Sequence, residues 1–437
     1  MAIALYVAKA NNISLDMSKN LFVKNIAQLV TCSGREAKRG AEAMNDIGLI
    51  EGPAAVVIRE GKIAYAGLMD GVDPELTKGC DVYDAAGCCV LPGFVDSHTH
   101  LVFGGFREDE FQWRLRGDSY MSIMERGGGI NNTMKATRGE SKEQLKESAR
   151  AHLDAMLAQG VTTVEAKSGY GMELEAELKQ LEVVAELQQE HPMTIFPTYM
   201  GAHSTPPEYA GREDEFIDYL NREVLPAVMK QGIARCCDIF TEKGVFDHAQ
   251  TRRYLAAAKE AGLKLKMHAD EIVSFAGAEL AAELGCLSAD HLLQISDKGI
   301  EALANSQTVA TLLPATAFSL KEPFAPGRKM IDNGCAVALA SDLNPGSCFS
   351  CSMPLLIALA TIYMNMTVEE AITALTINGA AALGLADQTG SIDEGKPGDL
   401  CIIRYPSYKF LSYHFAMNLV RATVKDGHVY AWPRTEL

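Results

Sequence analysis

The chain has 437 residues, of which 48% are hydrophobic and 22% charged, a composition typical of a globular protein with a large buried core. Its formal net charge of −16 at pH 7 argues against nucleic acid or an anionic membrane surface as a partner. No basic segment precedes the N-terminal run Met1–Val7, no apolar run approaches the roughly 18 residues of a membrane span, and the 11 cysteines lack a disulfide spacing. We therefore expect a cytoplasmic protein.

The first ninety residues or so are predicted to form β-strands. Short apolar runs such as residues 54–58 and 63–67 flank a turn at 59–62, and a second β-like patch, residues 399–430, follows near the other end of the chain. Neither patch has enough strands to bury both faces of a sheet. We expect residues 1–91 and 393–437 to form one small β-sandwich domain, with Met1–Asn20 as an extension without an assigned role.

Residues 92–392 alternate between β-like and helical patterns, as in a parallel sheet with crossover helices. The predicted helices have apolar residues at spacings of three and four, over 142–159, 174–189, 250–261 and 368–383. Eight such units predict an α/β protein built on a (β/α)8 TIM barrel, although an open doubly wound sheet has the same pattern. The predicted strands are Val90–Asp96, Val161–Ala166, Thr194–Met200, Cys237–Thr241, Leu263–Met267, Leu287–Ala289, Thr308–Leu313 and Val337–Ala340.

Two histidines follow the first of these strands. His98 and His100 are one residue apart, and residues i and i+2 of an extended chain point to the same side. Two converging imidazoles form half of a tetrahedral metal site. Such a pair also arises by chance in a chain with 10 histidines, so the interpretation depends on further ligands elsewhere.

Polar residues also follow the later predicted strands. In a barrel the carboxyl ends of all strands meet on one face, where active sites form. Each residue alone has an ordinary explanation, such as a helix cap for Asp342 or a satisfied core histidine for His291, but their shared position favours a functional site. The residues are Lys167, Ser168, Tyr170, His203, Glu242, His268, Glu271, His291, Asp342 and Asn344.

A complete set of metal ligands can be chosen from these side chains: His98, His100, His268 and Asp342. Three imidazoles and one carboxylate suit one zinc or iron ion with an open position for water. A metal-activated hydroxide at neutral pH predicts hydrolysis at a carbonyl or amidine carbon. His291 would stabilise the oxyanion, and Glu271 or Asp342 would pass a proton to the leaving nitrogen. Glu242 could bridge a second metal, but we expect one ion.

Further segments carry a more specific pattern: His98–Arg107, Gly127–Ile130, Glu165–Gly171, Gly201–His203, His268–Glu271, Ser288–His291 and Ser341–Ser347. Preceded by Pro92–Ser97, they resemble the amidohydrolase superfamily of metal-dependent hydrolases and, more closely, the imidazolonepropionase family. The resemblance implies a (β/α)8 barrel with a small β domain from both ends of the chain. It also implies hydrolysis of the cyclic amide of 4-imidazolone-5-propanoate to N-formimidoyl-L-glutamate in histidine degradation.

The resemblance implies roles for individual residues as well. The four ligands above would hold one zinc or iron ion, and Arg107 would pair with the propionate of the substrate. Tyr170 and His203 would hold the ring and carboxylate, while Glu271 would contact a ring nitrogen. A forked, always-charged guanidinium suits a carboxylate, although composition alone favours an ordinary surface arginine. The remaining expected contacts are Asn344, Gly346 and Ser347.

Two other interpretations stay open. The chain could be a deaminase or amidase of the same superfamily acting on another ring, but a nucleobase has no propionate for Arg107 to bind. It could also be a barrel that has lost its chemistry, a case in which we would expect missing ligands. A small-molecule substrate and, on base rates for soluble enzymes, a homodimer are expected.

Overall fold

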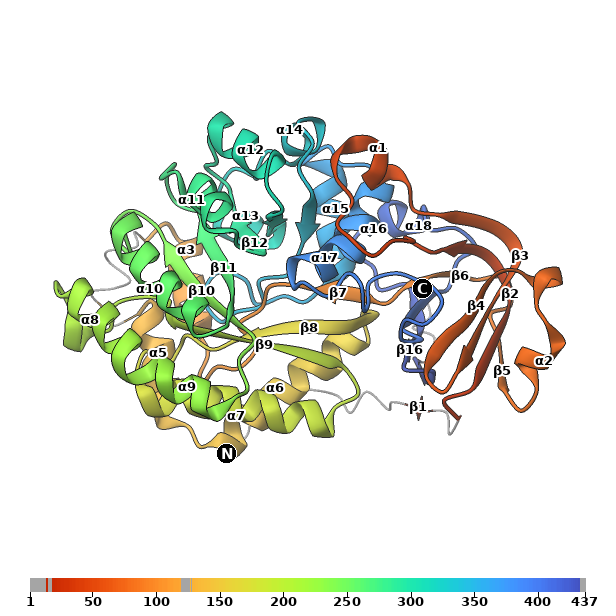
Figure 1. Cartoon of the computed structure of the whole chain (residues 1–437), viewed down its shortest axis with the longest axis horizontal. Coiled ribbons are helices and arrows are strands. Elements are labelled where there is room, and N and C mark those ends of the chain that lie inside the picture. The colour runs from red at the N-terminus through yellow and green to blue at the C-terminus, as the bar shows by residue number, and fades with distance from the viewer. Residues whose placement is uncertain (1–12, 15–17, 119–125, 127, 433–437) are drawn as a thin grey trace.

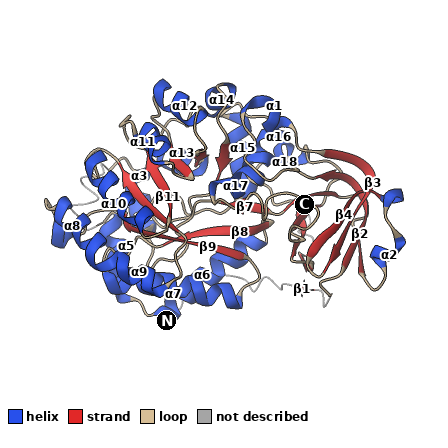
Figure 2. Cartoon of the chain, in the orientation of Figure 1, coloured by secondary structure: helices blue, strands red, loops and turns tan. Residues whose placement is uncertain are grey.

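The computed structural model describes residues 13–14, 18–118, 126 and 128–432 of the chain. It contains a barrel surrounded by helices and, beside it, a second sheet (Figure 1; Figure 2). The predicted extension Met1–Asn20 lies for the most part outside the described residues. No helix of the described part is long and apolar enough to cross a membrane.

Eight parallel strands form the barrel, hydrogen-bonded in chain order from β7 to β14. Helices cover their outer side in Figure 2, as expected for repeated β/α units. The predicted fold class is confirmed. The strands are β7 (Phe94–Asp96), β8 (Val161–Lys167), β9 (Thr194–Ala202), β10 (Cys236–Thr241), β11 (Lys264–Ala269), β12 (Ser288–His291), β13 (Val309–Leu312) and β14 (Val337–Leu339).

The barrel closes through the residues that follow β7 and β14. The backbone N–H of His100 donates to the carbonyl of Leu343 at 2.9 Å, and the N–H of Asp342 donates to the carbonyl of His98 at 3.0 Å. Below them, the Asp96 carboxylate accepts hydrogen bonds from the N–H and hydroxyl of Ser341. Three predicted metal ligands therefore lie on the seam of the barrel.

The helices agree with the predicted periodicity, with one exception. The predicted helix 368–383 is wrong, because the structure has two helices there, separated at Thr376. The backbone of Thr376 is not helical, and its hydroxyl donates to the carbonyl of Ile372 at 2.7 Å, a local bond that competes with helix continuation. The helices are α1 (Gly40–Asn45), α2 (Pro74–Thr77), α3 (Glu108–Leu115), α5 (Ile130–Gly139), α6 (Lys142–Leu157), α7 (Leu174–Glu190), α8 (Glu213–Tyr219), α9 (Leu225–Gln231), α10 (His248–Glu260), α11 (Gly277–Leu284), α12 (Asp297–Ala304), α13 (Pro314–Leu320), α14 (Gly327–Asp332), α15 (Met353–Ile362), α16 (Val368–Ala374), α17 (Ile377–Ala382) and α18 (Phe410–Tyr413).

The second sheet, called here the terminal sheet, joins both end segments of the chain, as predicted. Figure 1 shows its N-terminal strands in red and orange next to β16 in blue. Along the sheet the order is β1-β17-β16-β15-β6-β2-β3-β4, with β5 beside β2. The strands are β1 (Ile13–Ser14), β2 (Leu21–Val30), β3 (Leu49–Arg59), β4 (Lys62–Leu68), β5 (Asp81–Asp84), β6 (Cys89–Pro92), β15 (Leu400–Ile403), β16 (Val420–Lys425) and β17 (His428–Ala431).

The predicted strand Val90–Asp96 is wrong as a single element, because Gly93 divides it between the two sheets. β6 pairs with β15 of the terminal sheet, whereas β7 pairs with β8 of the barrel. A Cβ at position 93 would lie 2.3 Å from side-chain atoms of Thr162, so this crossing point requires glycine. The N–H of Gly93 donates to the carbonyl of Asp399.

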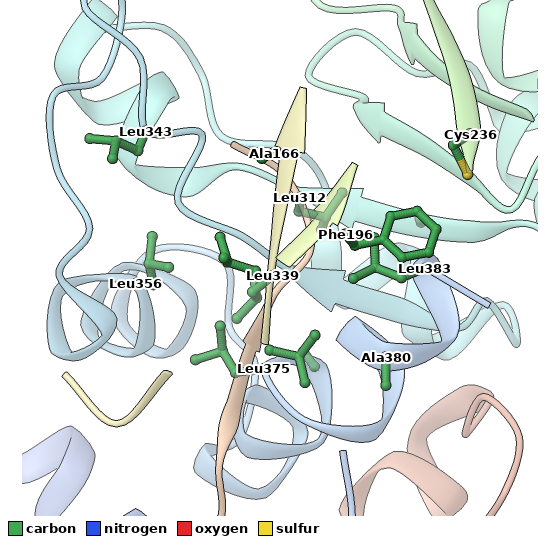
Figure 3. Packing of buried hydrophobic residues seen from close by; sticks show 14 of the residues in the cluster. Ala166, Phe196, Cys236, Leu312, Leu339, Leu343, Leu356, Leu375, Ala380 and Leu383 are labelled. Atoms are coloured by element: carbon green, nitrogen blue, oxygen red, sulfur yellow. The ribbon is translucent and has the colours of Figure 1, made fainter. Parts of the chain in front are cut away.

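Alternate residues of β6 and β15 face two different hydrophobic cores, as the twofold period of a strand requires. Leu91 and Ile403 join the core of the barrel, whereas Val90 and Ile402 join that of the terminal sheet. Figure 3 shows part of the barrel core, in which strand residues meet helical ones such as Ala380. Shared strands therefore attach the terminal sheet to the barrel.

Candidate metal centre and active site

The four predicted metal ligands lie together at the carboxyl end of the barrel. Among the described residues, three overlapping groups of side chains have ligand atoms within 4.8 Å of one another. One group joins His98 and His100 to Asp342, and His268 belongs to the other two groups. The three groups are His98, His100 and Asp342; His98, His268 and His291; and His100, His203 and His268.

The donor atoms of these residues fit a divalent transition metal. Tetrahedral ligands about 2.0–2.1 Å from an ion are about 3.3–3.4 Å apart. His268 Nε2 lies 3.4 Å from His100 Nε2, and Asp342 Oδ1 lies 3.6 Å from His98 Nε2 and 3.8 Å from His100 Nε2. The buried Nε2 of His98 has no hydrogen-bond partner among the described residues. This chemistry suits zinc or iron, whose common ligands are imidazole and carboxylate.

Two buried aspartates orient two of the histidines. His98 Nδ1 lies 2.6 Å from Asp290 Oδ2, and His268 Nδ1 lies 3.2 Å from Asp238 Oδ1. Burial lowers the pKa of His98 well below its usual range, so the ring is neutral. A neutral imidazole that donates from Nδ1 carries its lone pair on Nε2. Both rings are therefore set to bind a metal through Nε2.

The two aspartates belong to a larger buried network of charges: Glu165, Lys167, Asp238, Lys266 and Asp290, all with 0% exposure. Lys167 Nζ lies 2.6 Å from Asp238 Oδ2 and 2.8 Å from Glu165 Oε2. Lys266 Nζ lies 3.0 Å from Glu165 and 3.5 Å from Asp290. Buried ions destabilise a protein unless they are paired, so this network fixes the two aspartates below the histidines.

Residues at or just after the ends of three barrel strands have an unusual backbone. Asp270, His291 and Asp342 have φ angles of 49°, 78° and 51°, in the left-handed region that side-chain-bearing residues seldom adopt. The carboxylate of Asp270 accepts backbone N–H groups at the start of α11, whereas His291 and Asp342 belong to the ligand groups. Asp342 is held further by Thr316, whose hydroxyl donates to Oδ2 at 2.7 Å. Burial raises the pKa of Asp342 to about 6 despite this hydrogen bond.

Aromatic side chains lie next to the predicted ligands. The ring of His203 stacks on that of His100 with centroids 4.7 Å apart, and Tyr170 lies 5.1 Å from His203. Burial, with His268 nearby, lowers the pKa of His203 to about 3, so the ring is neutral. Its Nδ1 donates to the carbonyl of Gly169 at 3.1 Å, which leaves Nε2 as an acceptor.

The predicted anion-binding arginine lies against the loop that follows β14. A Cβ at Gly346 would fall 2.1 Å from Arg107 Nη1, so the guanidinium occupies space that only glycine leaves open. Asn344 folds this loop, because its Oδ1 accepts the N–H groups of Gly346 and Ser347. Both ends of the Asn344 amide bond within the loop, since Nδ2 donates to the carbonyl of Asp342 and to Ser347 Oγ.

Glu271 and His291 lie together on the other side of the ligands. Glu271 Oε1 is 3.5 Å from His291 Nδ1. Burial raises the pKa of Glu271 to about 8, with further contributions from Asp342 and Glu242. This environment therefore favours the protonated form of the Glu271 carboxyl. Glu242 itself accepts the N–H groups of Lys243 and Ile272 and belongs to none of the three ligand groups found among the described residues.

Sequence reasoning missed the charges below the ligands. Asp238 and Lys266 each have an apolar or cysteine neighbour on both sides within a buried strand, and that contrast was the available signal. It also missed Glu110, a buried acid on α3 that contacts Arg107. Three acids begin that helix, and their order alone does not show which one is buried.

Comparison with known proteins agrees with this geometry. The model of the amidohydrolase family matches residues 89–429. A Porphyromonas gingivalis protein named imidazolonepropionase is 73% identical over 94% of this chain and 97% of its own length. A Clostridium tetani protein of the same name is 55% identical over 94% of this chain and 98% of its own length.

Solved structures show the same fold at low identity. The atrazine chlorohydrolase of Arthrobacter aurescens TC1, complexed with zinc, has a TM-score of 0.72 at 16% identity, over 94% of each chain. An adenosine deaminase of Xanthomonas campestris with bound zinc has a TM-score of 0.66 at 16% identity, over 96% of this chain and 94% of the other. With these matches, the chain is a member of the amidohydrolase family and, within it, of the imidazolonepropionase family.

Proposed function

We propose that the chain hydrolyses the cyclic amide of 4-imidazolone-5-propanoate to N-formimidoyl-L-glutamate, a step of histidine degradation. The observation that carries this proposal is the 73% identity, over nearly the full length of both chains, to a protein named imidazolonepropionase. The ligand groups at the carboxyl end of the barrel support it, because a cyclic amide is opened by water that needs activation.

We further propose that one zinc or iron ion binds to four residues of the chain: His98, His100, His268 and Asp342. When bound, such an ion lowers the pKa of a coordinated water and polarises a nearby carbonyl, which supplies a nucleophile at neutral pH. Asp290 and Asp238 keep His98 and His268 in the tautomer that this binding needs. The seam of the barrel holds His98, His100 and Asp342 at fixed separations.

The substrate is proposed to lie between the ligands and Arg107. The guanidinium would bind the propionate through paired hydrogen bonds, which fix the direction of the ring. Tyr170 would donate its hydroxyl proton, since burial holds the pKa of Tyr170 above its usual range. The lone pair on His203 Nε2 would accept a ring N–H. The loop residues Asn344, Gly346 and Ser347 would line the same pocket.

Proton transfer is assigned to residues beside the ligands. Glu271 contacts a ring nitrogen in this proposal, and the raised pKa of its carboxyl suits it to pass a proton to the nitrogen that leaves the carbonyl carbon. His291, 3.5 Å from Glu271, stabilises the oxygen on which negative charge develops. Asp342 completes the catalytic set by holding the ligand geometry. The expected cytoplasmic location and homodimer stay predictions.

The proposal is tested by turnover of freshly prepared 4-imidazolone-5-propanoate, followed as loss of its ultraviolet absorbance. Metal content is determined on the same sample, and we expect about one equivalent of zinc or iron. Asp342→Ala should lose metal and activity together, whereas Asp70→Ala, at an exposed position in the turn that follows β4, should lose neither. Normal turnover by the Asp342→Ala protein would contradict the ligand assignment, and no turnover by the metal-loaded parent would contradict the function.

A further inference from the structure

Glu110 is a buried carboxylate with three partners around the predicted anion site. It is 6% exposed, although it lies in the first turn of the short surface helix α3. Oε2 accepts hydrogen bonds from Arg107 Nε at 2.8 Å and from the N–H of Gly129 at 3.0 Å. Oε1 accepts one from Asn132 Nδ2 at 3.1 Å. One carboxylate thus joins Arg107 to the start of helix α5.

The contact with Glu110 fixes the direction of the guanidinium. Glu110 binds its Nε edge, and the Nη1 end lies against Gly346 in the loop that follows Asp342. Arg107 also acts on Tyr170, a neighbour of His100: burial raises the pKa of that phenol, and the charge of Arg107 opposes the rise. Because Glu110 takes the Nε edge, the carboxylate of the proposed substrate would bind at the Nη end.

A second guanidinium approaches the same loop. Arg114 Nη1 lies 3.4 Å from the carbonyl of Gly346, and Nη2 lies 3.3 Å from Ser319 Oγ. Its buried Nε has no hydrogen-bond partner among the residues that the structure describes. Burial, and then the charge of Arg107, lower the pKa of Arg114, while Glu110 opposes this. Glu110 therefore offsets the repulsion between Arg107 and Arg114. The three side chains together carry one net positive charge, which matches the single negative charge of the substrate's carboxylate.

We propose that Glu110 is a positioning residue for the carboxylate end of the substrate. It turns the Nη end of Arg107 toward the proposed substrate and allows Arg107 and Arg114 to lie against the same loop at Gly346. This inference rests on the proposed function, because that function supplies the carboxylate. Glu108 and Asp109, the neighbours of Glu110, lie in the same first turn of α3 but are exposed. A variant of one of them therefore shows the general effect of an acid near the helix N-terminus, separately from the positioning of Arg107 by Glu110.

The test compares Glu110→Gln with Asp109→Asn, which removes the same charge one residue away, in the metal-loaded enzyme. A glutamine can still accept the N–H of Gly129 but has no charge to hold Arg107. We expect Glu110→Gln to raise KM for 4-imidazolone-5-propanoate about 10- to 100-fold, as misplacement of a binding group does, with kcat changed less than about threefold. Glu110→Asp should recover part of the loss, and Asp109→Asn should match the parent.

Two unreactive inhibitors separate positioning from a general loss of structure. We expect Glu110→Gln to weaken inhibition by 3-(imidazol-4-yl)propanoate by the same factor as KM, and inhibition by 4-propylimidazole less than about twofold. Equal weakening of both, or equal effects of Glu110→Gln and Asp109→Asn, would overturn the inference. Should Glu110→Gln fail to fold, Asn132→Ala, which removes one partner of Glu110 but no charge, must show the same selective loss in smaller measure.

Failure of the proposed function has a different signature. A metal-loaded parent enzyme that neither turns over the substrate nor distinguishes the two inhibitors would overturn the function and this inference with it. A parent that turns over the substrate, beside a Glu110→Gln protein with unchanged constants, would overturn this inference and leave the function standing.

Discussion

The barrel and the terminal sheet are built from similar strands but bury different kinds of side chain. Barrel strands bury Glu165, Lys167, Asp238, Lys266 and Asp290 completely. In the described strands of the terminal sheet the one buried charged residue is Lys425, at the end of β16. It pairs with Asp399 at 3.0 Å, away from the apolar core of that sheet.

This difference separates stability from positioning. Burial of apolar surface stabilises a fold by about 25 cal/mol per Å² and requires no particular orientation of the side chains. Such burial is enough to hold the terminal sheet together. Buried ions lose the favourable free energy of hydration, and only well-placed partners compensate for that loss. They therefore add little net stability, but they fix the geometry of the groups around them. The barrel therefore holds the proposed metal ligands with buried ion pairs, whereas the terminal sheet relies on apolar contacts.

Removing one lysine from each sheet should give the largest effect. Lys167→Met leaves Asp238 and Glu165 without their shortest cationic contacts, and we expect a loss of about 3–5 kcal/mol in the free energy of unfolding, together with loss of metal. Lys425→Met should lose a similar amount but keep its metal. Denaturant titration and metal analysis measure both quantities, and equal metal loss in the two variants would remove the contrast.

The second prediction compares two aspartate–histidine pairs, one below the proposed metal ligands and one near the outer helices. Asp238→Asn should weaken metal binding about 10- to 100-fold, because His268 loses the acceptor that fixes its tautomer. Asp154→Asn changes a similar pair between Asp154 on α6 and His191 at the end of α7, 3.4 Å apart, and should leave metal binding unchanged. Competition with a chelator of known affinity measures both, and unaltered binding in Asp238→Asn would argue against positioning by the network.

A smaller effect is expected in the apolar core of the terminal sheet. Ile402 is fully buried on β15, and Ile402→Val should lower the free energy of unfolding by about 0.5–1.5 kcal/mol. We expect kcat and KM to match those of the parent, because none of the described residues of this core belongs to the three ligand groups. A change in kcat of more than about twofold would show that the terminal sheet also shapes the site.

The smallest effect is a pH dependence at Asp393. Burial opposes ionisation, but hydrogen bonds from Ser33, Ser391 and the N–H of Gly34 lower the pKa of Asp393 below its usual value. A lowered pKa in the folded state stabilises above the unfolded value of about 3.9, and the contribution disappears as the pH falls through the folded pKa.

Asp393→Asn should therefore be less stable than the parent at pH 6, by at most about 1 kcal/mol because the site is partly exposed. The difference should shrink toward pH 3 in thermal unfolding curves. A difference in stability that stays constant between pH 6 and pH 3 would mean that the hydrogen bonds of this side chain stabilise the fold independently of its charge.

Much of this fold could be predicted, because buried parallel strands are continuous apolar runs and their order follows the chain. The division at Gly93 could not, since it depends on the side chain of Thr162, which is distant in sequence. The proposed ligands were found because strand-end residues meet in any barrel. The partners of those ligands were not, because the predicted strand Leu287–Ala289 ends before Asp290, and the sequence does not show which histidine Asp290 faces. Glu110 was missed for a related reason, since its burial is decided by Gly129 and Asn132 on another helix.

The pairing of β6 with β15 has a consequence for the newly made chain. Strands β2 to β6 leave the ribosome before the barrel residues, but their apolar side is completed by Leu400, Ile402 and Val424, which come far later. Pairing across so long a separation is slow, because the chain loses loop entropy before it gains the contacts. Uncovered strand edges also associate with other chains. Aggregation during synthesis should therefore concentrate in the interval between emergence of the barrel and emergence of the last three strands.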